Sequence, residues 1–424
     1  MSRTITSLLP RRGHPITLPL LPLVVLLAVA FLALPAAASS GDRNPTFQHC
    51  LRGCQLTYCD PSQPLISLWL RMAGWSCADN CKYSCAHSFT DNIRTGGRWH
   101  QFYGKWPFYR LGPIQEPISV LASLGNLFVN LKGLEQVRRR VRQENGLRRW
   151  LEVLAFVQVN TWVWSAVFHS RDTPFTERLD YLSATITIAY TLLYTVLRVT
   201  GLLTPLCTSR LAIPVAACFG LLVVSHWTYL LSFPAGSFPY GYHTKFNLVL
   251  AAAHNLLWII WTSSFYVTIP PLQIGRWTLA LPHPYPPNDP RRVRAKDANT
   301  PAVLVGLTTL AMSFELLDFA PVFRLLDAHA LWHISTIPLA VGWWTFLCND
   351  AIELEGSLLN ARGVSAVGAD AKMPLSGGAA SSNVTEKQKE KERERAELDA
   401  AAAAAQQIKS PSFSQVASGA ATRD

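Results

Sequence analysis

Seven long apolar segments constrain the fold of this 424-residue chain more than any other feature of its sequence. An α-helix needs ~20 predominantly apolar residues to cross a bilayer, and the segments approach that length. Hydrophobic residues make up 49% of the chain and charged residues only 15%, a balance typical of membrane proteins. The sequence therefore predicts an all-α membrane protein, a seven-transmembrane-helix bundle with spans at residues 114–129, 150–169, 179–202, 211–231, 246–267, 302–319 and 330–348.

The amino terminus has the pattern of a secretory signal peptide. Three arginines precede an apolar run from residue 18 to residue 34, and the run ends in small residues suited to signal peptidase. We expect a signal peptide over residues 1–40, cleaved near Ala38 or Ser40; an uncleaved membrane anchor is the alternative. In both cases the next segment enters the lumen of the secretory pathway.

Most of the cysteines lie between residues 41 and 112, which we call the Cys-rich segment. An even number of cysteines in an oxidising compartment predicts disulfides, here three, whose pairing the sequence leaves open. A metal cluster is the alternative, but the spacings differ from the CxxC pairs of ribbon-type zinc sites. The cysteines concerned are Cys50, Cys54, Cys59, Cys77, Cys81 and Cys85.

Charges in the connections predict the orientation of the bundle. Basic residues gather after the first and fifth spans, whereas residues 233–243 contain no Lys or Arg. The positive-inside rule places the basic connections, and with them the carboxyl terminus, in the cytosol. The basic residues behind the formal charge of +11 therefore indicate how the bundle is oriented in the membrane. We expect no nucleic-acid partner. The bundle then covers residues 113–350, and a cytosolic, largely disordered tail covers residues 351–424. The basic residues expected in the first cytosolic connection are Lys132, Arg138, Arg139, Arg140, Arg142, Arg148 and Arg149.

Five polar residues in or directly beside these spans have the composition of a catalytic zinc site. Ser165 and His169 are four residues apart, as are His329 and His333, so each pair shares one face of its helix. Asp180 opens the third span. The predicted topology puts all five at the lumenal ends of their helices. Three imidazoles with a carboxylate and a hydroxyl are typical of catalytic zinc, and ionisable residues within spans usually have a functional role.

Other ionisable residues near this depth allow more than one interpretation. Glu116, at the start of the first span, either orients a metal-bound histidine or caps its helix. Glu315 and Asp318 have the same two interpretations. His226 and His254 fit a hydrogen-bonding residue between helices as well as a ligand, so both are left out of the site.

The residues of the candidate site resemble those of a known superfamily. The pattern Trp164-Ser165-x-x-x-His169, followed by Asp180 and by His329-x-x-x-His333, is similar to that of seven-helix hydrolases that include the alkaline ceramidases and adiponectin-receptor-like proteins. The Cys-rich segment narrows the resemblance to the Per-one-like family, the post-GPI-attachment phospholipases. The residues that carry it are Gly41-Asp42-Arg43, His49-Cys50, Cys54 and Glu116-Pro117-Ile118-Ser119.

This resemblance implies a zinc-dependent membrane hydrolase. It implies a Zn²⁺ ion held by His169, His329 and His333, with Ser165 and Asp180 completing the site. The implied reaction removes the sn-2 acyl chain of glycosylphosphatidylinositol (GPI) anchors, with GPI-anchored proteins as substrates and membrane lipids as neighbours. We expect the endoplasmic reticulum membrane, with the Golgi membrane as the alternative.

Chemistry assigns roles to the two residues that are not imidazoles. Asp180 would take the proton of the attacking water as general base and return it to the leaving group. Ser165 would hydrogen-bond the water or the developing oxyanion, and a serine nucleophile is the alternative.

Two other functional classes also fit the sequence. One is a seven-helix lipid receptor in which zinc is structural. The other is a non-catalytic escort or metal-homeostasis factor. A transport site should spread ionisable residues along a path through the bilayer, whereas here they gather at one end of the spans.

Overall fold

The computed structural model describes residues 39–60, 66–93, 97–234, 237–266, 272–274, 277–279 and 295–361. The predicted signal peptide, apart from its last two residues, and the chain beyond residue 361 lie outside the described residues. All contacts reported below belong to the unit Met1–Ala366.

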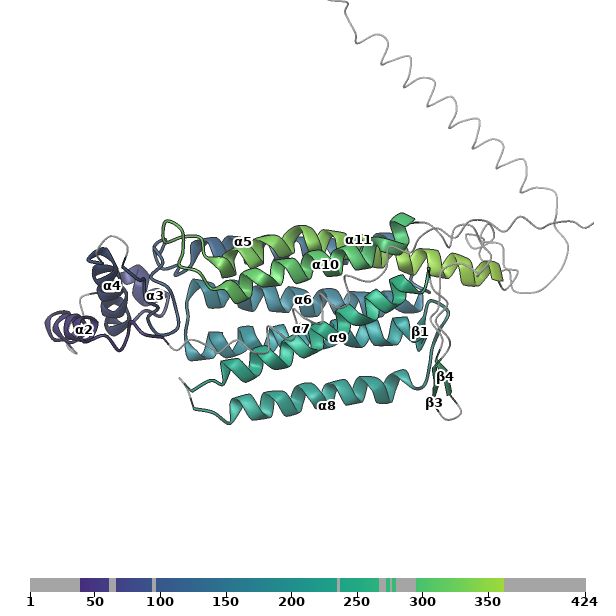
Figure 1. Ribbon diagram of the computed structural model, residues 1–424, viewed down its shortest axis with the longest axis horizontal. Coiled ribbons are helices and arrows are strands. Elements are labelled where there is room, and N and C mark those ends of the chain that lie inside the picture. The colour runs from purple at the N-terminus through teal and green to yellow at the C-terminus, as the bar shows by residue number, and fades with distance from the viewer. Residues whose placement is uncertain are drawn as a thin grey trace, which may run out of the picture. The chain divides into compact units, whose positions relative to one another are not determined.

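Seven helices of the described residues are long and apolar enough to cross a membrane. This confirms the predicted fold class: a mainly helical chain with seven candidate membrane helices. Figure 1 shows them running lengthwise beside one another, with α8 at one side of the group. They are α5 (Pro117–Arg140), α6 (Gly146–Ser170), α7 (Pro174–Val199), α8 (Ala212–Leu231), α9 (Tyr240–Ser263), α10 (Ala295–Leu317) and α11 (Ala328–Ala361).

The helix ends differ from the hydropathy-based expectation, most of all in α5 and α11. Helix α5 continues to Arg140, so Lys132 and three of the arginines expected in a loop belong to its last turns. Helix α11 continues to Ala361, past the expected end of the bundle at residue 350. Hydropathy ends a segment at the first charges, but a helix continues until its backbone hydrogen bonds stop. Basic side chains also suit the carboxyl-terminal turn of a helix.

Two short antiparallel hairpins lie in the connections and were not predicted. Strands β1 (Leu203–Thr204) and β2 (Cys207–Thr208) pair between α7 and α8. Strands β3 (Leu272–Ile274) and β4 (Trp277–Leu279) pair between α9 and α10. They are too short to change the fold class.

The Cys-rich segment folds around two disulfide-linked helices, α2 (Pro45–Tyr58) and α4 (Cys77–Asp91), with a short α3 (Leu68–Met72) between them. Helix α4 begins at a capping box in which Ser76 and Asp79 bond each other's backbone. Three disulfides confirm the sequence prediction and, for these cysteines, exclude the metal-cluster alternative. They are nested: Cys50–Cys85, Cys54–Cys81 and Cys59–Cys77.

The nested arrangement predicts how the disulfides share the stabilisation. Removing the middle bridge leaves the chain still closed by the outer and inner bridges. Because loop-closure entropy grows slowly with loop length, the unfolded chain then gains little conformational entropy. We expect Cys54→Ala with Cys81→Ala to cost about 1 kcal/mol or less, and replacement of all six cysteines to cost several kcal/mol. Limited proteolysis within residues 41–112 measures both. Full protease sensitivity after loss of the middle bridge alone would contradict the expectation.

The Cys-rich segment contacts the bundle at the ends of several helices. The Tyr109 amide donates to the carbonyl of Arg324, in the α10–α11 connection, at 2.9 Å. The Arg324 guanidinium lies 2.9 Å from Nδ1 of the buried His87 of α4. Asp318 accepts hydrogen bonds from Gln101 at 2.8 Å and from the indole of Trp106 at 2.9 Å. The segment is therefore held against the end of the bundle at which α11 begins.

Helices α5 and α11 approach each other closely at two glycines of α5. A Cβ atom at Gly133 would lie 2.4 Å from the Trp344 ring, and one at Gly125 would lie 2.8 Å from Ile337. Small residues at helix contacts in membranes permit this approach. The close approach also allows a hydrogen bond between the two helices, in which the Asn126 amide donates to the backbone carbonyl of His333 at 2.7 Å.

At the end of the bundle away from the Cys-rich segment, α7 and α11 share a buried ion pair. Arg198 is fully buried, and its Nε and Nη2 atoms donate to the two carboxylate oxygens of Asp350 at 2.7 and 2.6 Å. This bidentate geometry gives the strongest form of such a pair.

Breaking this pair from one side should destabilise the bundle. We expect Arg198→Met to cost roughly 3–5 kcal/mol, because it leaves the Asp350 carboxylate buried without its cation. Thermal unfolding of the detergent-solubilised protein measures the effect. The double variant Arg198→Met with Asp350→Leu should recover most of the loss, and an unchanged Tm in the single variant would argue against the pair.

Candidate metal centre

Three histidines from two helices meet at the end of the bundle nearest the Cys-rich segment. His169 lies in the last turn of α6, while His329 and His333 lie in the first turns of α11. One ring nitrogen from each lies within 4.8 Å of the others, and the His169 ring centroid is 5.1 Å from both other rings. We call these three residues the histidine cluster. Residues separated by more than 150 positions in sequence are thus brought together as expected.

Each histidine of the cluster has a polar partner at Nδ1. His169 Nδ1 lies 2.7 Å from Glu116 Oε2, and His329 Nδ1 lies 2.5 Å from Glu315 Oε2. His333 Nδ1 lies 3.4 Å from the Ser123 hydroxyl. A neutral imidazole that donates to a carboxylate from Nδ1 keeps a lone pair on Nε2, which is the arrangement of metal-bound histidines.

The Nε2 atoms of the cluster suit a shared cation. His169 Nε2 is buried and has no hydrogen-bond partner among the described residues. His329 Nε2 and His333 Nε2 lie 2.8 Å apart. Two imidazole lone pairs at that distance repel each other unless a proton or a metal ion lies between them. The donors therefore fit a metal that accepts nitrogen ligands, and zinc is such a metal.

Lys105 lies on the far side of Glu116 from the cluster. Its ammonium is 2.5 Å from Glu116 Oε1 and 3.3 Å from Asp172 Oδ2. Burial alone would lower the pKa of Lys105, but the two carboxylates outweigh it and raise that pKa above its usual value. Burial likewise opposes ionisation of Glu116, yet Lys105 and His169 hold the pKa of its carboxyl well below the usual range. Glu116 is therefore a buried carboxylate between two partners.

Ser165 and Asp180 line the cavity beside the histidines. The Ser165 hydroxyl lies 3.0 Å from that of Ser123, which connects it to His333. No side chain of the described residues donates a hydrogen bond to the carboxylate of Asp180, which lines the cavity. All five residues predicted from sequence thus gather at one end of the bundle.

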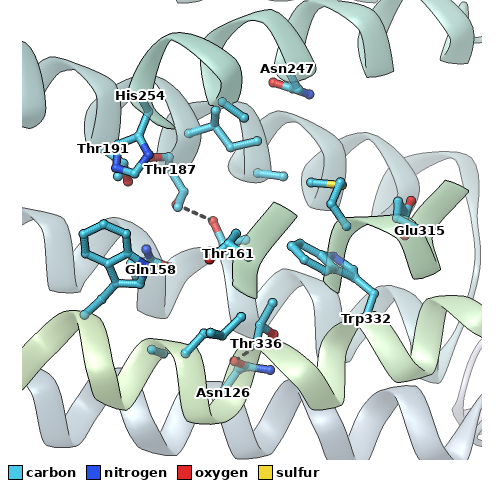
Figure 2. A pocket seen from close by; sticks show the side chains of 18 of the residues that line it. Asn126, Gln158, Thr161, Thr187, Thr191, Asn247, His254, Glu315, Trp332 and Thr336 are labelled. Atoms are coloured by element: carbon cyan, nitrogen blue, oxygen red, sulfur yellow. Dashed lines mark hydrogen bonds between the residues drawn. The ribbon is translucent and has the colours of Figure 1, made fainter. Parts of the chain in front are cut away.

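The cavity has a volume of about 450 Å³ and extends from the cluster into the bundle. Its walls come from every candidate membrane helix except α8. It reaches from Glu315 near the cluster to Trp344 and Leu347 of α11. Figure 2 shows polar side chains along this wall: Thr161 bonds Thr187 at 2.8 Å, and Thr336 bonds Asn126 at 3.1 Å. These polar groups hydrogen-bond one another, so much of the wall that a ligand would contact is apolar.

The other ionisable residues near this depth have identifiable partners in the structure. Glu116 and Glu315 hold histidines of the cluster, whereas Asp318 holds Gln101 and Trp106 of the Cys-rich segment. His226 bonds His243 of the neighbouring helix at 3.2 Å. His254 bonds Asn255 and Trp258 within its own helix and is not part of the histidine cluster.

Two residues of the site were missed by sequence reasoning. Ser123 belongs to a stripe of polar residues on one face of the first span, Ser119, Ser123, Asn126 and Asn130, whose helical spacing was a usable signal. Lys105 lies outside the spans in a segment without a recognisable motif. Its approach to Glu116 depends on the fold of the Cys-rich segment.

Comparison with known proteins identifies the family of the chain. Residues 67–351 match the profile of the Per1-like family. A Xenopus tropicalis relative named "GPI-specific phospholipase A2-like PGAP3" is 34% identical over 335 residues, covering 77% of this chain and 95% of that relative. The Homo sapiens form is 34% identical over 341 residues, covering 78% and 94%. A Drosophila melanogaster relative named "Post-GPI attachment to proteins factor 3" is 32% identical over 329 residues, covering 74% and 90%. No solved structure shows significant similarity. The chain therefore belongs to the Per1-like family.

Proposed function

We propose that this protein is a zinc-dependent hydrolase that cleaves the sn-2 acyl ester of GPI anchors and leaves the lyso form. The observation that carries the proposal is the histidine cluster, in which one ring nitrogen of each residue lies within 4.8 Å of the others beside a largely apolar cavity. The names of the relatives suggest the substrate, because they describe a GPI-specific phospholipase A2-like activity.

His169, His329 and His333 would hold the zinc ion. Glu116 and Glu315 would fix the ring orientation of two of them, and Ser123 would do so for His333. Bound zinc supplies Lewis-acid polarisation of an ester carbonyl and lowers the pKa of water toward ~7.

The remaining residues would move the proton and bind the substrate. Asp180 takes a proton from the attacking water and returns it to the departing lyso-lipid oxygen. Ser165 donates a hydrogen bond to the oxygen that becomes negative in the transition state. The cavity holds the acyl chain, whose apolar surface matches the apolar part of its wall.

The proposed orientation places this chemistry on the lumenal side of the endoplasmic reticulum or Golgi membrane. The disulfides of the Cys-rich segment suit an oxidising compartment, and this segment packs at the same end of the bundle as the histidine cluster. Basic residues gather at the other end of α5, which suits the cytosol. GPI anchors present their lipid esters near the lumenal surface.

A zinc-bound lipid receptor is the second candidate, because the cavity and the cluster fit ligand binding without turnover. One experiment separates the two. The full chain is purified in detergent, its zinc content is measured, and release of fatty acid from a GPI lipid is followed beside phosphatidylcholine as the control lipid. We expect about one zinc per chain and release from the GPI lipid. A zinc-loaded protein that binds the GPI lipid without releasing fatty acid would favour the receptor.

A further inference from the structure

A tight turn of the Cys-rich segment delivers Lys105 to the bundle. Phe102 and Lys105 exchange backbone hydrogen bonds of 2.7 and 3.0 Å across Tyr103 and Gly104, which both have positive φ. Phe102 is buried in the core of the disulfide-linked helices, with its ring centroid 4.8 Å from that of Phe47. Phe102 thus fixes the start of the turn in the disulfide-linked core, and Lys105, at its end, extends to Glu116 of the bundle.

The Lys105 ammonium is surrounded by two carboxylates and one aromatic ring. Its side chain is 20% exposed, and that of Glu116 is 6% exposed. The ammonium contacts Glu116 and Asp172 and lies 4.0 Å from the centroid of the Phe168 ring. Asp172 follows α6 and Glu116 precedes α5, so one lysine joins the start of α5 to the end of α6, the helix that carries His169.

We propose that Lys105 is a positioning residue of the metal centre, which makes the Cys-rich segment part of that centre. Lys105 holds Oε1 of Glu116, so the other oxygen, Oε2, faces Nδ1 of His169. This inference rests on the proposed zinc site and adds a role for a segment outside the bundle.

The physical reason lies in the cost of a buried charge. Without the lysine, Glu116 and Asp172 would face each other across a poorly hydrated space, and an unpaired buried carboxylate is costly. Glu116 would then rotate away from its present position toward water. That movement removes the fixed acceptor for His169 Nδ1 and loosens the ring that should bind metal.

Zinc retention tests the role of Lys105 independently of lipid hydrolysis. The full chain, loaded with zinc, is challenged with a chelator as wild type, Lys105→Met, Lys105→Arg and Lys82→Met. Lys82 is a matched control from the same segment, 41% exposed and paired with Asp79. We expect Lys105→Met to lose zinc roughly 10-fold faster or more, the range found when partners of metal ligands are removed. Lys105→Arg should recover part of the loss, and Lys82→Met should match wild type.

A double variant separates positioning from a general effect on folding. In a Glu116→Gln background, Lys105→Met should have little further effect on zinc loss, because the lysine acts through that carboxylate. Equal effects in both backgrounds, or wild-type retention in Lys105→Met, would overturn the inference. Lys105→Gln, which keeps a donor without the charge, carries the same expectation if Lys105→Met does not fold. A wild-type protein without zinc would overturn this inference and the proposed metal together, whereas zinc without fatty-acid release would overturn the proposed hydrolase alone.

Discussion

Replacing His333 by alanine is expected to abolish zinc binding and reduce hydrolysis of a GPI lipid by roughly 10³-fold or more. The estimate follows because a catalytic metal contributes several kcal/mol to transition-state stabilisation, and ~1.4 kcal/mol corresponds to tenfold in rate. His333 Nε2 faces His329 Nε2 at 2.8 Å, so its loss opens one side of the proposed site. Metal analysis and fatty-acid release measure the two effects.

His226→Ala is the matched control for this variant. His226 is also a buried histidine in a candidate membrane helix, but it bonds His243 and takes no part in the histidine cluster. We expect it to keep zinc and most of the activity. If His333→Ala remains folded with full zinc content and full activity, the proposed metal centre is wrong.

The meeting of the two halves of the site could be predicted from sequence because each half is local. Ser165 and His169 share a face by helical spacing, as do His329 and His333. Loop charges then assigned both halves to one end of the bundle. In the structure His169 and His329 have ring centroids 5.1 Å apart, which agrees with that reasoning.

The partners of the histidines could not be predicted with the same certainty. Glu315 was equally consistent with a helix cap, because its contact with His329 depends on how α10 packs against α11. Ser123 reaches His333 because Gly125 and Gly133 bring α5 close to α11. Such contacts depend on tertiary packing, about which periodicity and hydropathy carry no information.

The buried ion pair shows the same limit in another part of the bundle. Arg198 and Asp350 each look like a charge at the end of a span, and nothing in the spacing of the two residues indicates a contact. The pair forms because α11 extends beyond its apolar run and places Asp350 inside the helix.

Asp180→Asn is expected to lower hydrolysis by roughly 10²- to 10⁴-fold, the usual contribution of a general acid–base residue, while zinc remains bound. Asparagine keeps the shape of the side chain but cannot accept the proton of the attacking water. Asp180 lines the cavity and receives no side-chain hydrogen bond within the described part of the chain, so the substitution breaks no such bond. Zinc content and initial rates of fatty-acid release are measured on the same preparation.

Asp318→Asn is the matched control, because that carboxylate binds Gln101 and Trp106 rather than lining the cavity, and we expect activity near that of wild type.

Ser165→Ala decides between the two mechanisms that the site permits. If Asp180 is the general base, loss of the Ser165 hydroxyl removes one oxyanion donor and costs roughly 10²- to 10³-fold. If Ser165 is instead the nucleophile, Ser165→Ala should abolish release with zinc still bound, and a covalent acyl-enzyme should accumulate in Asp180→Asn. Mass spectrometry of the intact protein after mixing with the GPI lipid would detect that adduct, and its presence would replace the proposed water attack by acyl transfer through Ser165.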